Sequence, residues 1–409
     1  MDRLLLLLPT TTYRTQAFVD AASALGVELV CAAERPSTLA DLAPDRLLTL
    51  DWRDPDGSAA KVEAFARRRP IAAVVAVDDA TTVVAAAIGE RLGLGGNVVA
   101  AVSAARDKHR MRQCLAAAGV PVPRFRRIGL AEDPFVAARG VGFPCVLKPL
   151  ALSASRGVIR ADNVDQFIAA FKRIARLLGR DDVGLSGEAA THLLAEAYVP
   201  GVEVALEGLL VGGKLHTLAL FDKPDPLEGP FFEETIYVTP SRLPAPIQAR
   251  VAGVTAEACA ALGLEQGPVH AELRVNEHGP WIIEVAARSI GGLCSRTLRF
   301  GTGMSLEEII LRQALHWPIE SLERERQPAG VMMIPIPRAG RLGTVRGQEA
   351  AEAVAGIEEV AITAHSGQEL EPLPEGWQYL GFIFARAETP AAVEEALRDA
   401  HARLAFEIE

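Results

Sequence analysis

The sequence predicts a multidomain protein of mixed α/β and α+β class. Strand-like and helix-like segments alternate over the first hundred residues, whereas the later part contains paired strand patterns joined by short turns. The length of 409 residues exceeds that of a usual single domain. With 49% hydrophobic and 23% charged residues, the composition is that of an ordinary folded protein.

Charge and cysteine usage narrow the class further. The net charge of -10 argues against a general nucleic-acid binder, which would display a basic surface. The apolar run Leu4 to Leu8 is too short to cross a bilayer and lacks the flanks of a secretory signal. Five cysteines are scattered without CxxC spacing, which favours a reducing compartment and no zinc site. We therefore expect a cytoplasmic protein with neither nucleic-acid nor membrane partners.

The first hundred residues have the pattern of an open parallel sheet with helices between the strands. Such sheets place ligand contacts at the carboxyl ends of their strands. Asp78 and Asp79 follow the third expected strand and are therefore candidate site residues, although Asp is also a common helix N-cap. The turn PTTTYRT lacks GxGxxG, so dinucleotide binding is not predicted. The expected strands cover residues 4–8, 27–32 and 71–77, and the expected helices cover residues 13–25 and 80–92.

Two lysines and a small-residue loop form the next group of candidates. Lys108 lies at the start of a helix expected over residues 105–119, and Lys148 lies in the apolar strand VGFPCVLKPL. A lysine in such a strand needs an anionic partner unless its amine reaches the surface. The loop that follows, ALSASRGVIR, contains hydroxyls, an arginine and flexible backbone that could cradle a polyphosphate, although small-residue loops are common. Its candidate residues are Ser153, Ser155, Arg156 and Gly157.

The middle of the chain carries further carboxylates. Glu196 and Glu203 flank the Pro-Gly turn of the segment EAYVPGVEVALEG, and a hairpin is expected around GGK, over residues 204–221. The segment over residues 222–241 is rich in proline and glycine, so we expect an irregular loop crossing a pocket. Glu233 and Glu234 in this loop could recognise an ammonium group or could be solvated.

The stretch VHAELRVNEHGPWIIEVAARSIGGLC predicts two short strands around the turn NEHG. Each strand carries one glutamate, and antiparallel pairing would place Glu272 beside Glu284. Two adjacent carboxylates repel unless a cation joins them, and oxygen ligands of this kind suit Mg²⁺. Arg288 and the flexible segment SIGG follow directly. The alternative is a surface hairpin with two solvated glutamates.

In their order along the chain, these parts resemble the ATP-grasp superfamily, specifically its carboxylate–amine ligase branch that includes bacterial L-amino acid ligases. The resemblance extends over nearly the whole length and is most specific in EAYVPGVEVALEG and HAELRVNEHGPWIIEVAARSIGG. It implies a Rossmann-like N-terminal domain over residues 1–105, an ATP-grasp domain over residues 106–318 and a small C-terminal lid domain over residues 319–409. The ATP-grasp domain would divide into subdomains at about residues 120–193 and 194–318.

The resemblance also implies which residues would bind ATP. Lys108 and Lys148 would contact the phosphates, and Lys148 would also lie near the adenine. The loop from Ser153 to Gly157 would close over the phosphates. The purine and the ribose would be bound by the Glu196 carboxylate, the Tyr198 and Val199 backbone, and the Glu203 carboxylate.

The metal and the second substrate site follow from the same resemblance. Glu272 and Glu284 would hold Mg²⁺, with Mn²⁺ as the alternative ion. Arg288 and Lys148 are the expected catalytic residues, with Arg288 stabilising an acyl phosphate and the substrate carboxylate. The other expected substrate contacts are Asp79, Glu234, Tyr237 and the backbone amides of Gly291 and Gly292.

Three positions depart from the family pattern. Ala286 stands where many members have asparagine, which leaves a second metal ion in doubt. The phosphate loop is poorer in glycine than most, and Tyr237 stands where amino-acid ligases often have histidine. The substrate is therefore not copied from them.

The expected activity is ATP-dependent amide formation through an acyl phosphate, between a carboxylate and an amine of amino-acid type, releasing ADP and phosphate. The alternatives are a bicarbonate-activating enzyme like biotin carboxylase and a non-catalytic nucleotide-binding protein. Many members of the family are dimers, so the resemblance also implies a homodimer.

Overall fold

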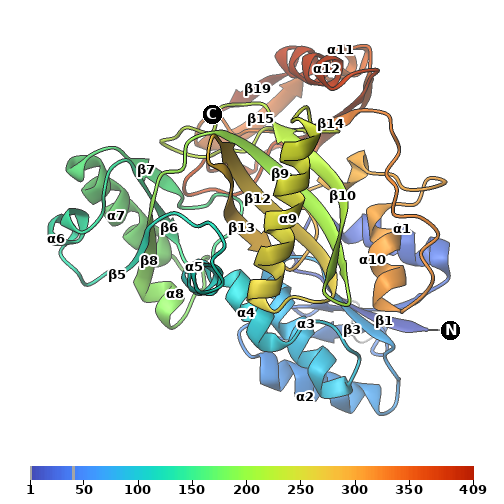
Figure 1. Cartoon of the computed structure of the whole chain (residues 1–409). Coiled ribbons are helices and arrows are strands. Elements are labelled where there is room, and N and C mark those ends of the chain that lie inside the picture. Colours follow the sequence, from blue (N-terminus) through green and yellow to red (C-terminus); the bar gives the residue numbers. More distant parts are fainter. Residues whose placement is uncertain (1, 39–41) are drawn as a thin grey trace.

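The computed structural model describes residues 2–38 and 42–409. Figure 1 shows the N-terminal domain (blue) at one end of the molecule, long central strands (yellow-green), a small subdomain (green) at their side, and the C-terminal part (red) at the far end. In the described ranges, no helix combines the length and the apolar character that crossing a bilayer would require.

The N-terminal domain is built on a four-stranded parallel sheet of order β3-β2-β1-β4. Its elements are β1 (Arg3–Leu7), α1 (Thr15–Leu25), β2 (Glu28–Ala33), β3 (Leu47–Thr49), α2 (Pro55–Ala66), β4 (Ala73–Ala76), α3 (Asp79–Leu92) and α4 (Val99–Arg106). The apolar run of β1 is fully buried, as expected for a strand covered on both faces. Asp79 begins α3 just beyond β4, at the carboxyl edge of the sheet.

The small subdomain has an antiparallel sheet of order β5-β8-β6-β7, which packs against the amphipathic helix α7. Helix α5 (Lys108–Ala117) precedes it. The elements of the small subdomain are β5 (Phe125–Gly129), α6 (Pro134–Arg139), β6 (Cys145–Pro149), β7 (Ile159–Ala161), α7 (Val164–Leu178), α8 (Glu188–Thr191) and β8 (His192–Ala197). The division predicted at residues 193/194 falls inside β8, whose whole length pairs within this sheet.

An eight-stranded sheet of order β13-β12-β9-β10-β11-β14-β18-β16 forms the centre of the molecule. The strands of this sheet that come first along the chain, with the helices between and after them, are β9 (Val202–Val211), β10 (Lys214–Lys223), β11 (Ile236–Thr239), α9 (Ala245–Leu262), β12 (Gly267–Asn276), β13 (Gly279–Ala286), a 3₁₀ helix (Cys294–Thr297) and α10 (Leu306–Ala314). The segment expected to be wholly irregular contains β11, which pairs with β10 and β14. The β-rich run IYVT inside this segment was the signal for that strand.

The C-terminal part extends the central sheet with β14, β18 and β16 and adds a small sheet of its own. Its elements are β14 (Ala329–Ile334), β15 (Gly340–Arg346), α11 (Gln348–Glu352), β16 (Ile357–Ile362), β17 (Glu369–Leu370), β18 (Gly381–Arg386), α12 (Pro390–Ala402) and β19 (Ala405–Ile408). Strand β14 pairs with β11, so the predicted boundary at 318/319 divides the chain but not the sheet. The chain ends in β19, which pairs with β15 in a second sheet of order β17-β15-β19.

Candidate active site

The hairpin of β12 and β13 pairs Glu272 directly with Glu284. Asn276 pairs with Gly279 across the turn, and from this register the two glutamates would be one residue out of step. A bulge between Glu272 and Leu273 absorbs the difference and leaves Ile283 as the extra residue. The predicted juxtaposition is confirmed, and both carboxylates line a cavity, so the hairpin is not a fully solvated surface feature.

Lys108 reaches the second glutamate of the hairpin. Its ammonium donates to Glu284 Oε1 at 3.0 Å and to the Leu152 carbonyl at 2.7 Å. The lysine is the first residue of α5, and the Asp107 side chain caps this helix by accepting from the His109 and Arg110 amides. The cap therefore fixes the direction in which Lys108 leaves the backbone.

Lys148 has the anionic partner that its buried position requires. Its ammonium lies 2.5 Å from Glu196 Oε2, and Arg112 Nε donates to Glu196 Oε1 at 2.6 Å. All three side chains are buried, so the alternative in which Lys148 reaches the surface is wrong. Burial alone would raise the pKa of Glu196, but Arg112 and Lys148 outweigh it and hold the pKa below its ordinary value.

Arg112 is a site residue that the sequence analysis missed. It is fully buried, and its second amino group donates to the Ile283 carbonyl at 2.6 Å, which is the bulge residue of the hairpin. One guanidinium thus joins the carboxylate of Glu196 to the strand that carries Glu284. The basic run KHRMR at the start of α5 was the available signal, because a buried helix face tolerates arginine only with a partner.

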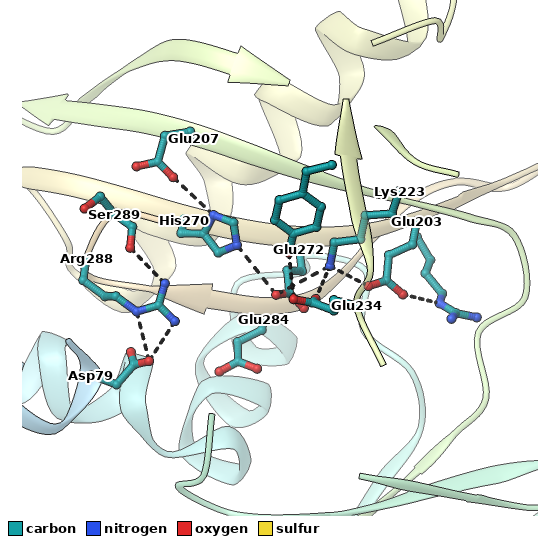
Figure 2. Close-up of polar contacts among 12 residues, drawn as sticks. Asp79, Glu203, Glu207, Lys223, Glu234, His270, Glu272, Glu284, Arg288 and Ser289 are labelled. Atoms are coloured by element: carbon teal, nitrogen blue, oxygen red, sulfur yellow. Dashed lines mark hydrogen bonds and ion pairs between the residues drawn. The ribbon is translucent and has the colours of Figure 1, made fainter. Parts of the chain in front are cut away.

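Lys223 is the second missed residue, and it lies among three carboxylates (Figure 2). Its ammonium contacts Glu203 at 2.9 Å and Glu272 at 3.6 Å, and it also donates to Glu234. The lysine ends the apolar strand LALFDK, much as Lys148 ends CVLK, so the pattern that revealed one could have revealed the other. Tyr237 donates to Glu234 at 2.8 Å and completes the group.

The pKa values of Glu234, Glu272 and Lys223 are shifted in different directions. Burial and the nearby Glu272 raise the pKa of Glu234 to about 7, against the opposing effect of Lys223. Burial would raise the pKa of Glu272 as well, but Lys223 and His270 hold it well below its ordinary value. Burial would lower the pKa of Lys223, yet the surrounding carboxylates keep it well above 10.5. Lys223 is therefore held as a cation beside the cavity carboxylates Glu203, Glu234 and Glu272.

The residues present fit a divalent cation. One oxygen each from Glu203, Glu234 and Glu272 lies within 4.8 Å of the others, and Glu284 adjoins Glu272 across the hairpin. An oxygen-only donor set is the chemistry that Mg²⁺ prefers. Each of these carboxylates is also paired with a lysine or arginine, and the hairpin register, which sets Glu272 beside Glu284, makes these two the candidate pair.

A buried histidine stands behind Glu272 (Figure 2). His270 Nε2 lies 3.6 Å from Glu272 Oε1, and its Nδ1 lies 3.2 Å from Glu207 Oε2. Glu207 has no exposed surface and also accepts from the Ile290 amide at 3.0 Å. Its other oxygen has no hydrogen-bond partner among the described residues. Glu207 therefore ties the histidine behind the candidate metal ligand to the backbone of the SIGG segment.

Arg288 and Asp79 meet across the boundary between the N-terminal domain and the central sheet. The Arg288 guanidinium donates to Asp79 Oδ2 at 3.0 and 2.8 Å and to the Ser289 carbonyl at 2.9 Å. A guanidinium has five N–H donors, so two remain for a ligand. Asp78 stands at the N-cap position of α3, yet its side chain makes no capping bond with the described residues.

One cavity of about 560 Å³ gathers nearly all the predicted site residues. Gly157 is the exception: its amide donates to the Pro374 carbonyl at 2.8 Å. Arg156 lines the cavity but donates to the Glu375 carbonyl at 2.6 Å and to Asp182 at 2.6 Å. Two of the donors expected to face phosphate are thus engaged by the protein itself. The predicted residues lining the cavity are Asp79, Lys108, Lys148, Ser153, Ser155, Arg156, Glu196, Tyr198, Val199, Glu203, Glu234, Tyr237, Glu272, Glu284, Arg288, Gly291 and Gly292.

Two lysines, paired carboxylates and a small-residue loop around one cavity, on this three-part fold, define a ligase of the ATP-grasp class. Comparison with family models agrees: an ATP-grasp N-terminal domain matches residues 19–96, an ATP-grasp domain matches residues 141–297, and L-amino acid ligase C-terminal domain 2 matches residues 332–409. The chain belongs to the ATP-grasp superfamily, and its C-terminal domain is of the L-amino acid ligase type.

Similar proteins include both characterised and uncharacterised ones. The chain is 24% identical over 402 residues to uncharacterized protein y4rH of Sinorhizobium fredii, covering 98% of this chain and 82% of that one. It is 28% identical over 279 residues to alanine–anticapsin ligase of Bacillus subtilis, covering 64% and 58%. Among solved structures, an L-amino acid ligase from Bacillus licheniformis superposes with a TM-score of 0.85 at 24% identity, covering 100% and 99%. The chain spans about half to two thirds of the length of the named bacterial ligases that it matches.

Proposed function

We propose that this protein is an ATP-dependent carboxylate–amine ligase that joins amino-acid-like substrates through an acyl phosphate. The observation that carries the proposal is the pairing of Glu272 with Glu284 in a cavity that Lys108 and Lys148 also line, with Lys223 in contact with Glu272. This set supplies both the anions that hold a phosphate-bound cation and the cations that offset phosphate charge. The names of the relatives, which include alanine–anticapsin ligase and D-alanine–D-alanine ligase, support the same reaction class.

The nucleotide would lie between the small subdomain and the central sheet. Tyr198 lies on the chain between the two sheets. The centre of its ring is 4.2 Å from Cζ of Arg160 and 5.1 Å from Cζ of Arg274. The Glu196 oxygens are bonded by Arg112 and Lys148 but keep lone pairs for the adenine amino group. The Val199 backbone and the Glu203 carboxylate would complete the purine and ribose contacts.

Phosphate charge would be offset by the lysines. Lys108 and Lys148 line the same cavity as the paired glutamates, Lys223 contacts Glu272 beside it, and buried cations act strongly in such a site. Mg²⁺ held by Glu272 and Glu284 would neutralise charge on the transferring phosphoryl group. Ser153 and Ser155 would contact the phosphates from the loop above.

In the first step, an oxygen of the substrate carboxylate attacks the γ-phosphorus, and the bond to the β,γ-bridging oxygen breaks to release ADP. The free donors of Arg288 and the amides of Gly291 and Gly292 would hold the carboxylate and then the acyl phosphate. Asp79 keeps the Arg288 guanidinium in place.

In the second step, the neutral amine attacks the acyl carbon, the bond from this carbon to the phosphate oxygen breaks, and the proton lost by nitrogen passes to the departing phosphate. Glu234, bonded by Tyr237, is the cavity carboxylate with a pKa near neutrality and would recognise the ammonium group. This chemistry needs charge and positioning more than a covalent nucleophile.

The test is a phosphate-release screen of the purified protein with ATP, Mg²⁺ and pairs of amino acids, followed by mass spectrometry of the products. The proposal predicts ADP, phosphate and an amide product that depends on both substrates. Release of AMP and pyrophosphate would contradict the acyl-phosphate route. ATP turnover with bicarbonate alone would instead favour the bicarbonate-activating alternative.

A matched pair of variants checks the metal site. Glu284→Gln keeps the shape of the side chain but removes its charge, and we expect at least a hundredfold loss of kcat/KM with an unchanged circular dichroism spectrum. Glu277→Gln, at the exposed turn of the same hairpin, should retain activity. Equal activity in both variants would remove Glu284 from the metal site.

The assembly state stays a prediction of the family resemblance, and the location stays a prediction from cysteine usage and the lack of secretory-signal flanks. We propose a homodimer acting in the cytoplasm, with Mg²⁺ replaceable by Mn²⁺. Light scattering coupled to gel filtration measures the assembly state, and ATP turnover with each ion measures whether Mn²⁺ replaces Mg²⁺.

A further inference from the structure

The chain between β17 and β18, residues 371–379 with sequence EPLPEGWQY, crosses from one half of the cavity to the other. We call this segment the C-terminal strap. It belongs to the C-terminal domain, in which none of the site residues expected from the sequence lies.

One end of the strap binds the phosphate loop and its neighbours. Pro374 accepts from the Gly157 amide at 2.8 Å, and the Glu375 carbonyl accepts from Arg156 at 2.6 Å. The Glu375 carboxylate forms an ion pair with Arg173 of α7, and Arg173 Nη2 donates to Glu375 Oε2 at 2.7 Å. A further pair joins Glu371 to Arg180 at 2.6 Å. The strap therefore holds the small subdomain against the C-terminal domain.

The other end of the strap faces the opposite half of the cavity, where Trp377 and Tyr379 are both lining residues. Tyr379 packs edge-on against Phe382 at 6.1 Å, and Tyr13 of the N-terminal domain packs on the same ring at 5.3 Å. The Tyr13 hydroxyl hydrogen-bonds with the Tyr379 backbone. A Cβ at Gly292 would lie 2.9 Å from Phe382, so this aromatic group adjoins the segment expected to hold the substrate carboxylate.

Aromatic side chains are concentrated around this cavity. Only 5% of the chain is aromatic, yet all four tyrosines and two of the four tryptophans line it. Tyr198 is on the nucleotide side, which leaves most of the others for the substrate. Met333, Ile290 and Cys294 add apolar surface beside them. An apolar and aromatic wall next to a carboxylate site would favour a substrate with a large apolar side chain.

We propose that the C-terminal strap selects a large apolar side chain on the acyl substrate and couples its binding to closure of the phosphate loop. Trp377 is the specificity-determining residue, and it lies on the chain between the phosphate-loop contact of Glu375 and the substrate-side contact of Tyr379. Four extended residues span at most about 14 Å, so a side chain seated on Trp377 or Tyr379 would steady the segment that holds Gly157. The inference rests on the proposed ligase function and deepens it.

The specificity half is tested by comparing L-leucine and L-phenylalanine with glycine and L-alanine as the acyl substrate. In the wild-type protein we expect kcat/KM to favour the large side chains. Trp377→Ala should reduce that preference at least tenfold, chiefly through KM for the amino acid, whereas Trp377→Phe should keep most of it. Trp377→Leu serves as a second apolar variant if the alanine variant is poorly folded. An unchanged preference in the alanine or leucine variant would overturn the proposal.

The coupling half is tested with two charge-removing variants, one in the strap and one in β17. Glu375→Gln should raise KM for ATP severalfold and weaken the stimulation of ATP turnover by L-leucine. Glu369→Gln is the matched control, because Glu369 pairs with Arg341 at an exposed position of β17. Identical behaviour of the two variants would overturn the coupling. Absence of phosphate release from the wild-type protein with every amino acid would refute the ligase function itself, which is a different result from an unchanged preference.

Discussion

His270 is the residue whose role the contacts define most sharply outside the predicted set. It stands between the buried Glu207 and the candidate metal ligand Glu272. A group paired with a ligating carboxylate from outside the metal site helps to hold that ligand in its orientation. We regard His270 as a positioning residue for Glu272.

Replacement of His270 by alanine should raise the Mg²⁺ concentration needed for half-maximal activity about tenfold, with a smaller change in KM for ATP. His270→Gln, whose amide can still donate toward Glu272, should recover part of the loss. The shorter side chain of His270→Asn reaches only toward Glu207, so this variant should not recover the loss. Equal Mg²⁺ requirements in all three variants would assign His270 a packing role alone.

Glu234 gives the unliganded protein a pH-dependent stability. Its pKa in the folded state is about 7, above the ordinary value of 4.5, so the folded state binds this proton more tightly than the unfolded chain. The stabilising contribution is complete below about pH 4.5 and is lost as the pH rises through about 7.

The free energy of unfolding should therefore fall between pH 6 and pH 8 by about 1 kcal/mol through this group. Urea titrations of the metal-free protein at both pH values would measure it. The Glu234→Gln variant should show a correspondingly smaller fall. Identical slopes in the variant and the wild-type protein would place the titration elsewhere.

At the scale of elements, helix α5 connects local sequence to site geometry. Asp107 caps the helix through the His109 and Arg110 amides, Lys108 follows it into the cavity, and Arg112 lies one turn further on. A weakened helix start would loosen both cations together.

Asp107→Ala should cost about 1 kcal/mol of stability, since a lost N-cap leaves helix amides unpaired. It should also raise KM for ATP, because Lys108 is the first helical residue. Asp107→Asn keeps an acceptor oxygen and should behave like the wild-type protein in both thermal denaturation and ATP kinetics. A stability loss without any change in KM would show that the cap does not position Lys108.

At the scale of the molecule, the three parts share one core. A single cluster of buried side chains includes Phe18 of the N-terminal domain, Phe221 of the central sheet and Phe382 of the C-terminal part. A buried ion pair crosses the same boundary, since Arg14 before α1 donates to Glu307 of α10 at 2.9 Å. Arg14 also donates to Ser289, next to Arg288.

Removal of one partner of this pair should be costly. Glu307→Ala leaves the buried Arg14 charge without its partner and should lower the free energy of unfolding by about 3 kcal/mol in urea titrations. The double replacement Arg14→Met with Glu307→Leu should cost much less, because no uncompensated charge remains. If the double variant is as unstable as the single one, the loss is one of packing and not of charge.

The sequence by itself determined the features with short-range causes. The alternation of strands and helices predicted the N-terminal sheet, and the offset of two glutamates around a turn predicted the carboxylate pair. Hairpin geometry is local, so Glu272 and Glu284 could be paired from spacing alone. The apolar strand around Lys148 likewise predicted that this lysine has an anionic partner, which the structure identifies as Glu196.

Only the tertiary structure decided which residues meet across large separations. Lys223, Arg112 and His270 gain their roles from carboxylates on other strands, and the C-terminal strap reaches the phosphate loop from more than two hundred residues away. Spacing within a strand carries no information about such contacts, because they depend on how sheets and helices pack. For the same reason, the sequence left the C-terminal domain without a functional role, and the packed structure places its aromatic side chains in the wall of the cavity.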